Sequence, residues 1–433
     1  MTMEWFWPEG FYALAMIVAF AVGAFAFKLP IAIAMSVSAM LGALLAGFGF
    51  PLRHLVEGMF GYIDTILIIA TAMIFMSIVQ AIGLMEAVAA WMIRRFRNSP
   101  LMLSSGVMFL VMIPGMLTGS STACCLTTGA LVAPVLLRLG VSSVKASAFI
   151  AMGAIYGMIA PPINIPVMII GGGIDMPYVG FALPLLAATI PLALFTVVLL
   201  VLPALRKKGG IDEAGLEADL VRMESTPLTP RLFIPFAVLI VLMGGEQLFP
   251  KVFPSLGMPL QFLIASASAF LTGRKWNVLD SATEAVRDAI PVLGILMGVG
   301  MFIQIMTLTG VRGFVVVSAL AIPAWLLYLS ISVSVPAFGA ISSFGAASVL
   351  GVPFILALLS KNQIMVASGL ALISGLGDLV PPTALAGIFA AQVVGEKDYF
   401  AVLKQCIIPG LATVAWGICI IVWANPLAAL LVR

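Results

Sequence analysis

The chain has 433 residues, of which 62% are hydrophobic and 9% charged, and its mean hydropathy is +1.20. Soluble domains carry about 25% charged residues, so the composition excludes a soluble protein and predicts an integral membrane protein. The formal net charge of +3 is small and says little about partners, and no nucleic-acid partner is expected. A single histidine, His54, expected in a short loop, excludes a histidine metal cluster, and with no nucleophile–base set we expect no enzyme and no organic cofactor.

The first half of the chain predicts five membrane spans and one hairpin, because a spanning helix needs about 20 mostly apolar residues. In chain order we expect spans at 11–27, 31–50 and 63–84, an amphipathic arm at 85–96, a re-entrant hairpin at 101–139, a broken helix at 146–170 and a span at 181–205. Residues 206–231 are the only sustained polar stretch and are expected to form a cytoplasmic linker.

The second half repeats this order. We expect spans at 232–248, 260–271 and 291–308, an arm containing Arg312, a hairpin at 325–359, a broken helix at 364–394 and a last span at 406–423. Because five is an odd number of spans, the two halves face opposite ways. The expected fold is therefore an all-α membrane protein whose halves, 1–205 and 232–433, form an inverted repeat.

The basic residues predict the orientation. With the N-terminus outside, sixteen of the 21 lysines and arginines fall on one face of the membrane. Cytoplasmic loops carry the excess of Lys and Arg, so that face is inside and both termini are expected to be periplasmic. The N-terminus has no basic region or cleavage pattern typical of a signal peptide, so none is expected.

Two proline pairs interrupt the expected broken helices, one in Ala160 to Asn164 and one in Val380 to Thr383, 220 residues apart. Proline removes a backbone N–H and clashes with the preceding turn, so two in a row must break a helix. In hydrocarbon the freed carbonyls need a polar partner, and such a break persists only against protein or a water-filled cavity.

The same 220-residue offset relates two further pairs, Gly119 with Gly339 and Gly157 with Gly377. Broken helices that meet within the bilayer indicate the binding site of a secondary transporter, where half-helix ends attract anions and unwound carbonyls replace the water shell of a small cation. Hydroxyl and amide groups there come from Ser120, Ser121, Thr122, Asn164, Ser342, Ser343 and Thr383. Alternatively, single Gly and Ser residues serve close helix packing.

Asp378 is the one carboxylate expected inside a broken helix. An intramembrane carboxylate is a candidate functional group, and it could bind a proton or a cation. Alternatively, it caps a half-helix or lies near the inner surface. We expect no Lys or Arg deep in the core, so the positive charge that holds a bound anion must come from helix ends and co-bound cations. This favours cation-coupled anion transport.

Four stretches resemble the large membrane subunit (DctM-like) of tripartite ATP-independent periplasmic (TRAP) transporters, within the ion transporter superfamily. They are Lys28 to Ala34, Thr118 to Ser121, Gly157 to Pro166 and Gly377 to Thr383. The resemblance implies an elevator-type, sodium-driven importer of organic acids, such as dicarboxylates, in the bacterial inner membrane. It also implies a periplasmic substrate-binding protein, a small four-helix membrane subunit and contact with membrane lipid.

The resemblance further implies two sodium sites and a substrate carboxylate between the tips. The first sodium would be held by Gly119, Ser120, Ser121, Ala160 and Pro161, and the second by Gly339, Ser342, Ser343, Val380 and Pro381. Substrate contacts are expected from Ser121, Thr122, Asn164, Ser343 and Thr383.

The chain departs from the family pattern at two places. An acidic residue usual after the first tip is replaced by Ala123-Cys124-Cys125, and the second hairpin, around residues 338–345, matches poorly. Two alternatives therefore remain: a stand-alone cation-coupled symporter or antiporter of the same superfamily, and a channel or membrane scaffold.

Overall fold

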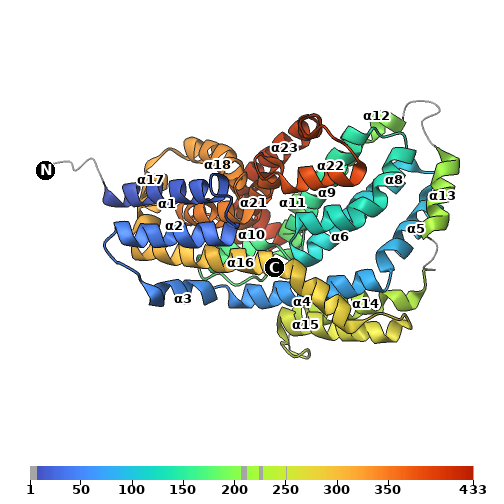
Figure 1. Ribbon diagram of the computed structural model, residues 1–433, viewed down its shortest axis with the longest axis horizontal. Coiled ribbons are helices and arrows are strands. Elements are labelled where there is room, and N and C mark those ends of the chain that lie inside the picture. The colour runs from blue at the N-terminus through green and yellow to red at the C-terminus, as the bar shows by residue number, and fades with distance from the viewer. Residues whose placement is uncertain (1–6, 206–211, 224–227, 250, 433) are drawn as a thin grey trace.

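The computed structural model describes residues 7–205, 212–223, 228–249 and 251–432, and every secondary-structure element in these ranges is helical (Figure 1). Seven helical segments within them are long and apolar enough to cross a membrane. The prediction of an all-helical, multi-span membrane protein is therefore confirmed. The expected linker is described only in part, since 206–211 and 224–227 lie outside the described residues, as do the terminal residues 1–6 and 433.

The elements up to the expected linker include the first hairpin and the first broken helix. They are α1 (Pro8–Phe25), α2 (Ile31–Leu45), α3 (Leu52–Phe60), α4 (Ile63–Ala81), α5 (Leu84–Phe96), α6 (Pro100–Thr118), α7 (Ser121–Cys124), η1 (Cys125–Gly129), α8 (Ala130–Arg138), α9 (Ser143–Ile159), α10 (Ile165–Gly172), α11 (Ala182–Leu200), α12 (Leu202–Leu205) and, inside the linker, α13 (Glu213–Met223).

The remaining elements include the second hairpin and the second broken helix. They are η2 (Pro230–Phe233), α14 (Ile234–Leu248), α15 (Gly257–Ala267), η3 (Ser268–Thr272), α16 (Val278–Leu308), α17 (Val311–Ala321), α18 (Ala324–Gly339), α19 (Ser343–Ala346), η4 (Ala347–Gly351), α20 (Val352–Ala357), α21 (Gln363–Gly375), η5 (Leu376–Leu379), α22 (Leu385–Val394), α23 (Tyr399–Val422) and α24 (Ala424–Leu431).

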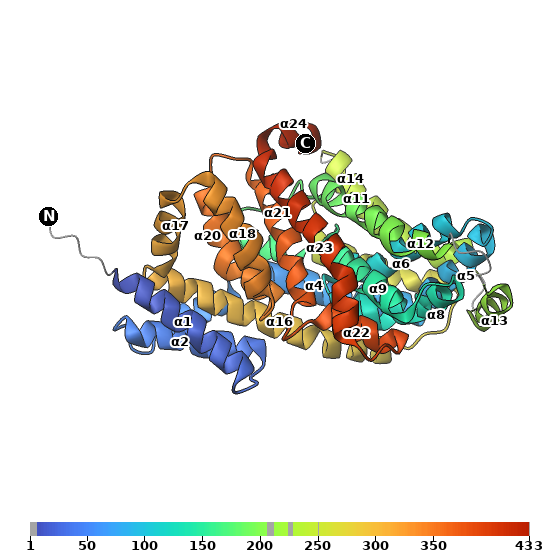
Figure 2. The same cartoon turned by 90° about the horizontal axis from the view of Figure 1, so that it is seen from above.

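The helices pack as two groups. In the α16 group, which comprises α1–α4 and α14–α16, α16 lies against α2, α3 and α4, and Figure 1 shows α1, α2 and α16 side by side along the long axis. In the α9–α21 group, which comprises α6–α11 and α18–α23, α9 contacts α6, α11, α22 and α23, while α21 contacts α10, α18 and α23. Figure 2 shows the second group running beside α16.

The two helices that end at the proline pairs form the core of the second group. Every residue of α9 from Ala146 to Ile159 is buried, as is every residue of α21 from Met365 to Gly375. Apolar side chains buried on all sides of a helix mark a position inside the protein, away from lipid. The broken helices are thus enclosed by their neighbours, as the freed backbone groups require.

Two expectations about local structure are wrong. His54 lies in α3 and not in a loop; this helix is steadied by an ion pair between Arg53 Nε and Glu57 Oε1 at 2.7 Å, one turn apart. The span expected at 291–308 begins at Val278, because Asn277 caps α16 by accepting from the Leu279 N–H at 3.0 Å and the helix continues through Pro291. At about 1.5 Å per residue, α16 is roughly 46 Å long, well beyond the hydrocarbon thickness.

Candidate functional site

The first broken helix is interrupted between Ile159 and Ile165. The Asn164 side chain bridges the gap, since its amide Nδ2 donates to the Ile159 carbonyl at 2.7 Å and its Oδ1 accepts from the Val167 N–H at 2.9 Å. The Ile163 N–H donates to the Met116 carbonyl at 3.0 Å, which ties the unwound loop to the hairpin helix α6. The peptide bond between Pro161 and Pro162 is cis.

The second broken helix has the same kind of attachment. After η5 the chain is unwound to Ala384, and the Pro381–Pro382 peptide bond is also cis. The Thr383 hydroxyl donates to the Ala340 carbonyl at 2.7 Å, and the Tyr399 hydroxyl donates to the Leu379 carbonyl. Each loop is therefore held to the hairpin of its own half.

Serine side chains cap both hairpin tips. Ser120 Oγ accepts from the Ala123 N–H at 3.2 Å at the start of α7, and Ser342 Oγ accepts from the Gly345 N–H at 3.0 Å at the start of α19. Such caps satisfy backbone donors that a helix start leaves free. Gly119 precedes the first cap with φ +67°, a conformation that glycine adopts without strain.

The two capping serines, Ser120 and Ser342, are 222 residues apart, whereas the predicted offset between the halves is 220. A Cβ on Gly377 would lie 2.5 Å from the backbone of Gly339, and a Cβ on Gly115 would lie 2.7 Å from the backbone of Gly157. Gly339 and Gly115 thus make the same kind of contact, because each lets a hairpin helix touch the backbone of a broken helix. The predicted equivalence of Gly157 and Gly377 agrees with these contacts.

Asp378 joins the two halves of the chain. Its carboxylate is buried on η5, beside the second break, and accepts a hydrogen bond from the Ser121 hydroxyl of the first tip. The Ser343 hydroxyl of the second tip is its other hydrogen-bonding neighbour. Asp378 is therefore a buried carboxylate at the contact between the two halves.

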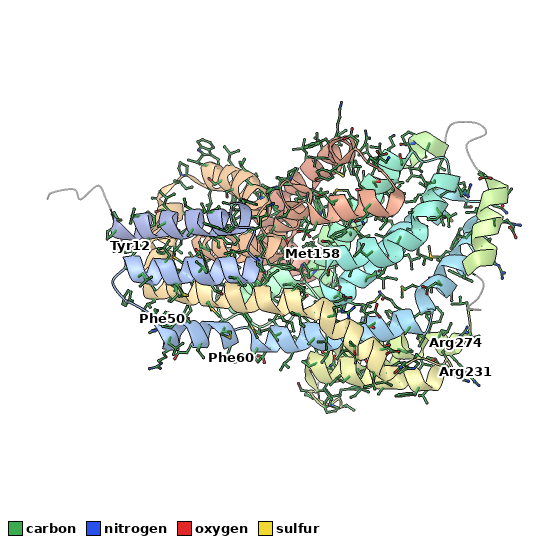
Figure 3. All side chains as sticks on the ribbon, viewed as in Figure 1. Tyr12, Phe50, Phe60, Met158, Arg231 and Arg274 are labelled. Carbon is green, nitrogen blue, oxygen red and sulfur yellow. The ribbon has the colours of Figure 1, made fainter. Side chains whose placement is uncertain are left out.

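A cavity of about 460 Å³ lies between the tips. It is lined by seven of the predicted site residues, namely Ser120, Ser121, Thr122, Ser342, Ser343, Asp378 and Thr383. Met158, labelled in Figure 3, forms part of its wall. The other predicted residues, which do not line it, are Gly119, Ala160, Pro161, Asn164, Gly339, Val380 and Pro381. Asn164 is fully buried, and its side-chain amide is used in hydrogen bonds to the backbone on both sides of the break. Its role is therefore structural.

The α16 group contributes charged side chains that the sequence reasoning missed. Glu284, Arg287 and Asp288 lie on one face of α16 and line the cavity. Arg287 adds a guanidinium to the lining, and its side chain is exposed. The sequence-based prediction starts this span at Pro291 and so leaves these residues outside it; the capping residue Asn277 is the signal that the helix begins earlier.

The family described as "Tripartite ATP-independent periplasmic transporter, DctM component" matches residues 14–427. The chain belongs to this family. It is thus the large permease subunit of a TRAP transporter and not an enzyme. A DctM component belongs to a tripartite system, with a periplasmic binding protein and a small subunit as the other parts.

Two solved structures are similar to this DctM component in fold. The YdaH transporter of Alcanivorax borkumensis has a TM-score of 0.59 at 16% identity, over 85% of this chain and 86% of that one. MtrF of Neisseria gonorrhoeae, described within a class of antimetabolite efflux pumps, has a TM-score of 0.60 at 14% identity, over 97% and 95% of the two chains. The comparison with curated proteins finds no match.

Proposed function

We propose that this DctM component carries an organic acid inward together with sodium ions. The observation that carries the proposal is the meeting of both tips at Asp378, where Ser121 from the first half and Ser343 from the second line one cavity. A cavity between polar hairpin tips, beside two broken helices, is the arrangement in which transporters exchange the water shell of an ion for protein oxygens.

Sodium would be bound beside each tip. Hydroxyl oxygens and unwound carbonyls suit a hard cation, and each half offers a serine pair next to a broken loop held to its own hairpin. The first ion would use Ser120 and Ser121 with the loop at 160–161, and the second would use Ser342 and Ser343 with the loop at 380–381. The substrate carboxylate would lie between the ions, near Thr122.

The transport movement would be of the elevator type, in an inverted repeat. The α16 group would stay fixed as a scaffold while the α9–α21 group, which carries both tips, slides along it. Separate packing within each group supports this division. The α16 side chains that line the cavity would then belong to the fixed wall past which the substrate moves.

The chain would lie in a bacterial inner membrane with both termini periplasmic. Arg231 and Arg274, both assigned to the cytoplasmic face, lie at one end of the molecule, and Tyr12 and Phe50 lie at the other (Figure 3). The family match favours a receptor-fed system with a four-helix partner subunit over a stand-alone symporter.

Uptake into liposomes tests the proposal. Two sodium ions with one monoanion carry a net positive charge inward, which is worth roughly 2.3 kcal/mol at 100 mV. We expect uptake of the acid to require external sodium and to rise with an inside-negative potential. Equal uptake after replacement of sodium by choline at fixed pH would refute sodium coupling.

A further inference from the structure

The cavity contains more negative than positive side chains. Its ionisable lining consists of three carboxylates, Glu284, Asp288 and Asp378, and one guanidinium, that of Arg287. Even without Asp378, the two carboxylates that α16 contributes to the lining outnumber the one guanidinium. None of the three α16 groups forms a hydrogen bond or an ion pair with another described residue, and all three side chains are exposed where they line the cavity. Such a lining repels a ligand that brings two negative charges.

The hydroxyls at the centre of the site cannot donate a hydrogen bond to a substrate carboxylate, because their hydrogens are already used. A serine hydroxyl has one hydrogen and two acceptor lone pairs. Ser121 and Ser343 direct their hydrogens to Asp378, and Thr383 directs its hydrogen to the Ala340 carbonyl. The groups around Asp378 therefore offer only lone pairs to the cavity, and lone pairs bind cations.

Donors for a carboxylate lie elsewhere on the lining. Ser120 and Ser342 accept from backbone N–H groups, which leaves their own hydroxyl hydrogens free, and Arg287 adds a guanidinium. The cavity thus has one region that favours a carboxylate and another, around Asp378, that favours a positive charge.

We infer that the substrate is an organic acid that also carries a cationic amino group. The carboxylate is held by the Ser120 and Ser342 hydroxyls and Arg287, and the ammonium is held by the Asp378 carboxylate. This inference rests on the proposed function, since it concerns the same cavity and the same inward transport.

A panel of matched ligands tests it. The full chain in lipid nanodiscs is titrated in sodium with γ-aminobutyrate, butyrate and succinate, whose four-carbon skeletons end in an ammonium, a methyl and a carboxylate. A second series pairs the α-amino acids of two to six carbons with the acids that lack the amino group. The readout is thermal stabilisation, repeated in choline.

We expect aminated acids to stabilise the protein in the presence of sodium, with an affinity about tenfold or more above that of the partner acid. The ammonium is attracted by the carboxylates of the cavity, whereas a second carboxylate on the ligand is repelled by them. Equal or tighter binding of succinate and the other acids, still dependent on sodium, overturns this inference and leaves the proposed function standing. No stabilisation by either series, or stabilisation that is the same in choline, overturns both.

Charge-removing variants give a second test. Asp288→Asn and Asp378→Asn should each reduce the preference for aminated over plain acids, since each removes a charge from the lining. Asp280→Asn is the matched control: it removes the same charge from the same helix at an exposed position outside the cavity. The inference is overturned if the preference for aminated over plain acids is unchanged in all three variants, or if all three variants change it to the same extent.

Discussion

At the scale of single residues, the hydroxyls were predictable and their partners were not. The sequence identified Ser120, Ser121, Ser342 and Ser343 because each pair lies on a small-residue tip before an apolar run. It did not reveal that Ser121 bonds Asp378, since these residues are 257 apart in the chain. A pattern of residues places a group on a helix or a tip, but a contact between distant segments depends on packing.

The serine pairs give a direct prediction. In Ser120→Ala/Ser121→Ala, and separately in Ser342→Ala/Ser343→Ala, we expect the sodium concentration for half-maximal uptake to rise about tenfold, since a lost contact to a charged group is worth about 1.5–3 kcal/mol. The measurement is uptake by liposomes over a range of sodium concentrations. Ser105→Ala is the control, because its exposed hydroxyl bonds only the Leu101 carbonyl of its own helix. Unchanged sodium activation in both double variants would remove these hydroxyls from the ion sites.

At the scale of elements, prolines alone did not fix the helix boundaries. Pro114, Pro191, Pro291 and Pro409 all lie inside continuous helices, whereas both proline pairs coincide with breaks. A single proline costs a helix one hydrogen bond, which a buried helix tolerates among its neighbours. The breaks were therefore predictable from sequence, and the start of α16 was not.

The contact between α18 and η5 depends on two glycines. Gly377→Ala should destabilise the chain by about 1–3 kcal/mol, as overpacking does, because its Cβ would lie 2.5 Å from the backbone of Gly339. Thermal unfolding in detergent measures the effect. Gly410→Ala, in the middle of α23 with open space around its Cα, should leave stability unchanged or raise it. Equal midpoints for the two variants would contradict the close approach.

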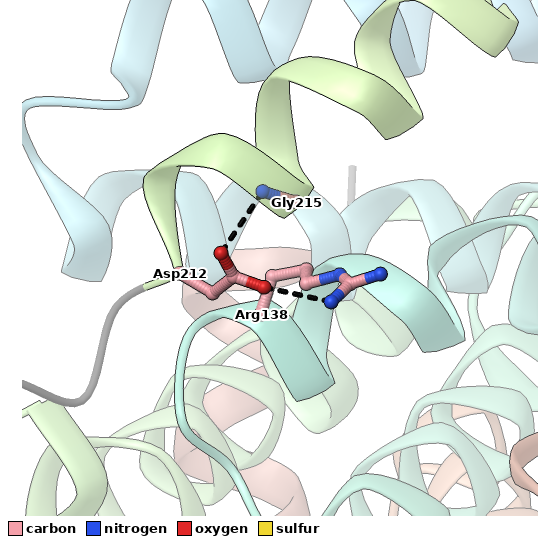
Figure 4. Close-up of polar contacts among 3 residues, drawn as sticks. All are labelled: Arg138, Asp212 and Gly215. Carbon is pink, nitrogen blue, oxygen red and sulfur yellow. Dashed lines mark hydrogen bonds and ion pairs between the residues drawn. The ribbon is translucent and has the colours of Figure 1, made fainter.

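The helix α13 is fastened to the first hairpin by Asp212. Its carboxylate accepts from Arg138 Nη1 at 2.7 Å and from the Gly215 N–H at 2.9 Å (Figure 4), and these bonds lower the pKa of Asp212 below its ordinary value of 3.8. Because the pKa is lowered in the folded chain, the attachment is complete above pH 3.8 and is lost as the pH falls through the lower, folded value.

Removal of this carboxylate should therefore loosen the start of α13 at neutral pH. In Asp212→Asn we expect faster hydrogen exchange at the Gly215 amide, measured by mass spectrometry of peptides from this segment. Glu217→Gln is the comparison, since Glu217 faces Arg97 at 3.6 Å with both side chains exposed, and such pairs contribute little. Exchange that is equally fast in the two variants would show that Asp212 does not hold the helix.

At the scale of the whole molecule, membrane class, helix order and family were all predictable, because apolar runs and broken helices are local signals. The division into two packing groups was not predictable, since α1–α4 lie in a different part of the sequence from α14–α16. Nor could the cavity wall be assigned, because Glu284, Arg287 and Asp288 reach it only through the packing of α16 beside the second tip.

The elevator proposal can be tested by joining the two groups. Phe20 of α1 and Phe338 of α18 stack with ring centroids 5.8 Å apart, one in each group. In Phe20→Cys/Phe338→Cys we expect oxidation by copper phenanthroline to stop uptake and dithiothreitol to restore it. Phe75→Cys/Phe262→Cys joins two helices of the α16 group across the same centroid distance, 5.8 Å, and should transport normally when oxidised. Full activity of the first variant after complete cross-linking would argue against sliding.

The bond from Ser121 to Asp378 also has a consequence for biosynthesis. The ribosome makes the first tip 257 residues before Asp378. Until Asp378 has been made and packed, the Ser121 hydroxyl of an inserted tip has no carboxylate to donate to. A polar group left unmatched away from water is costly, and a chain that stops short of Asp378 retains that cost. Quality-control proteases should therefore remove such truncated products even though most of their spans are already inserted.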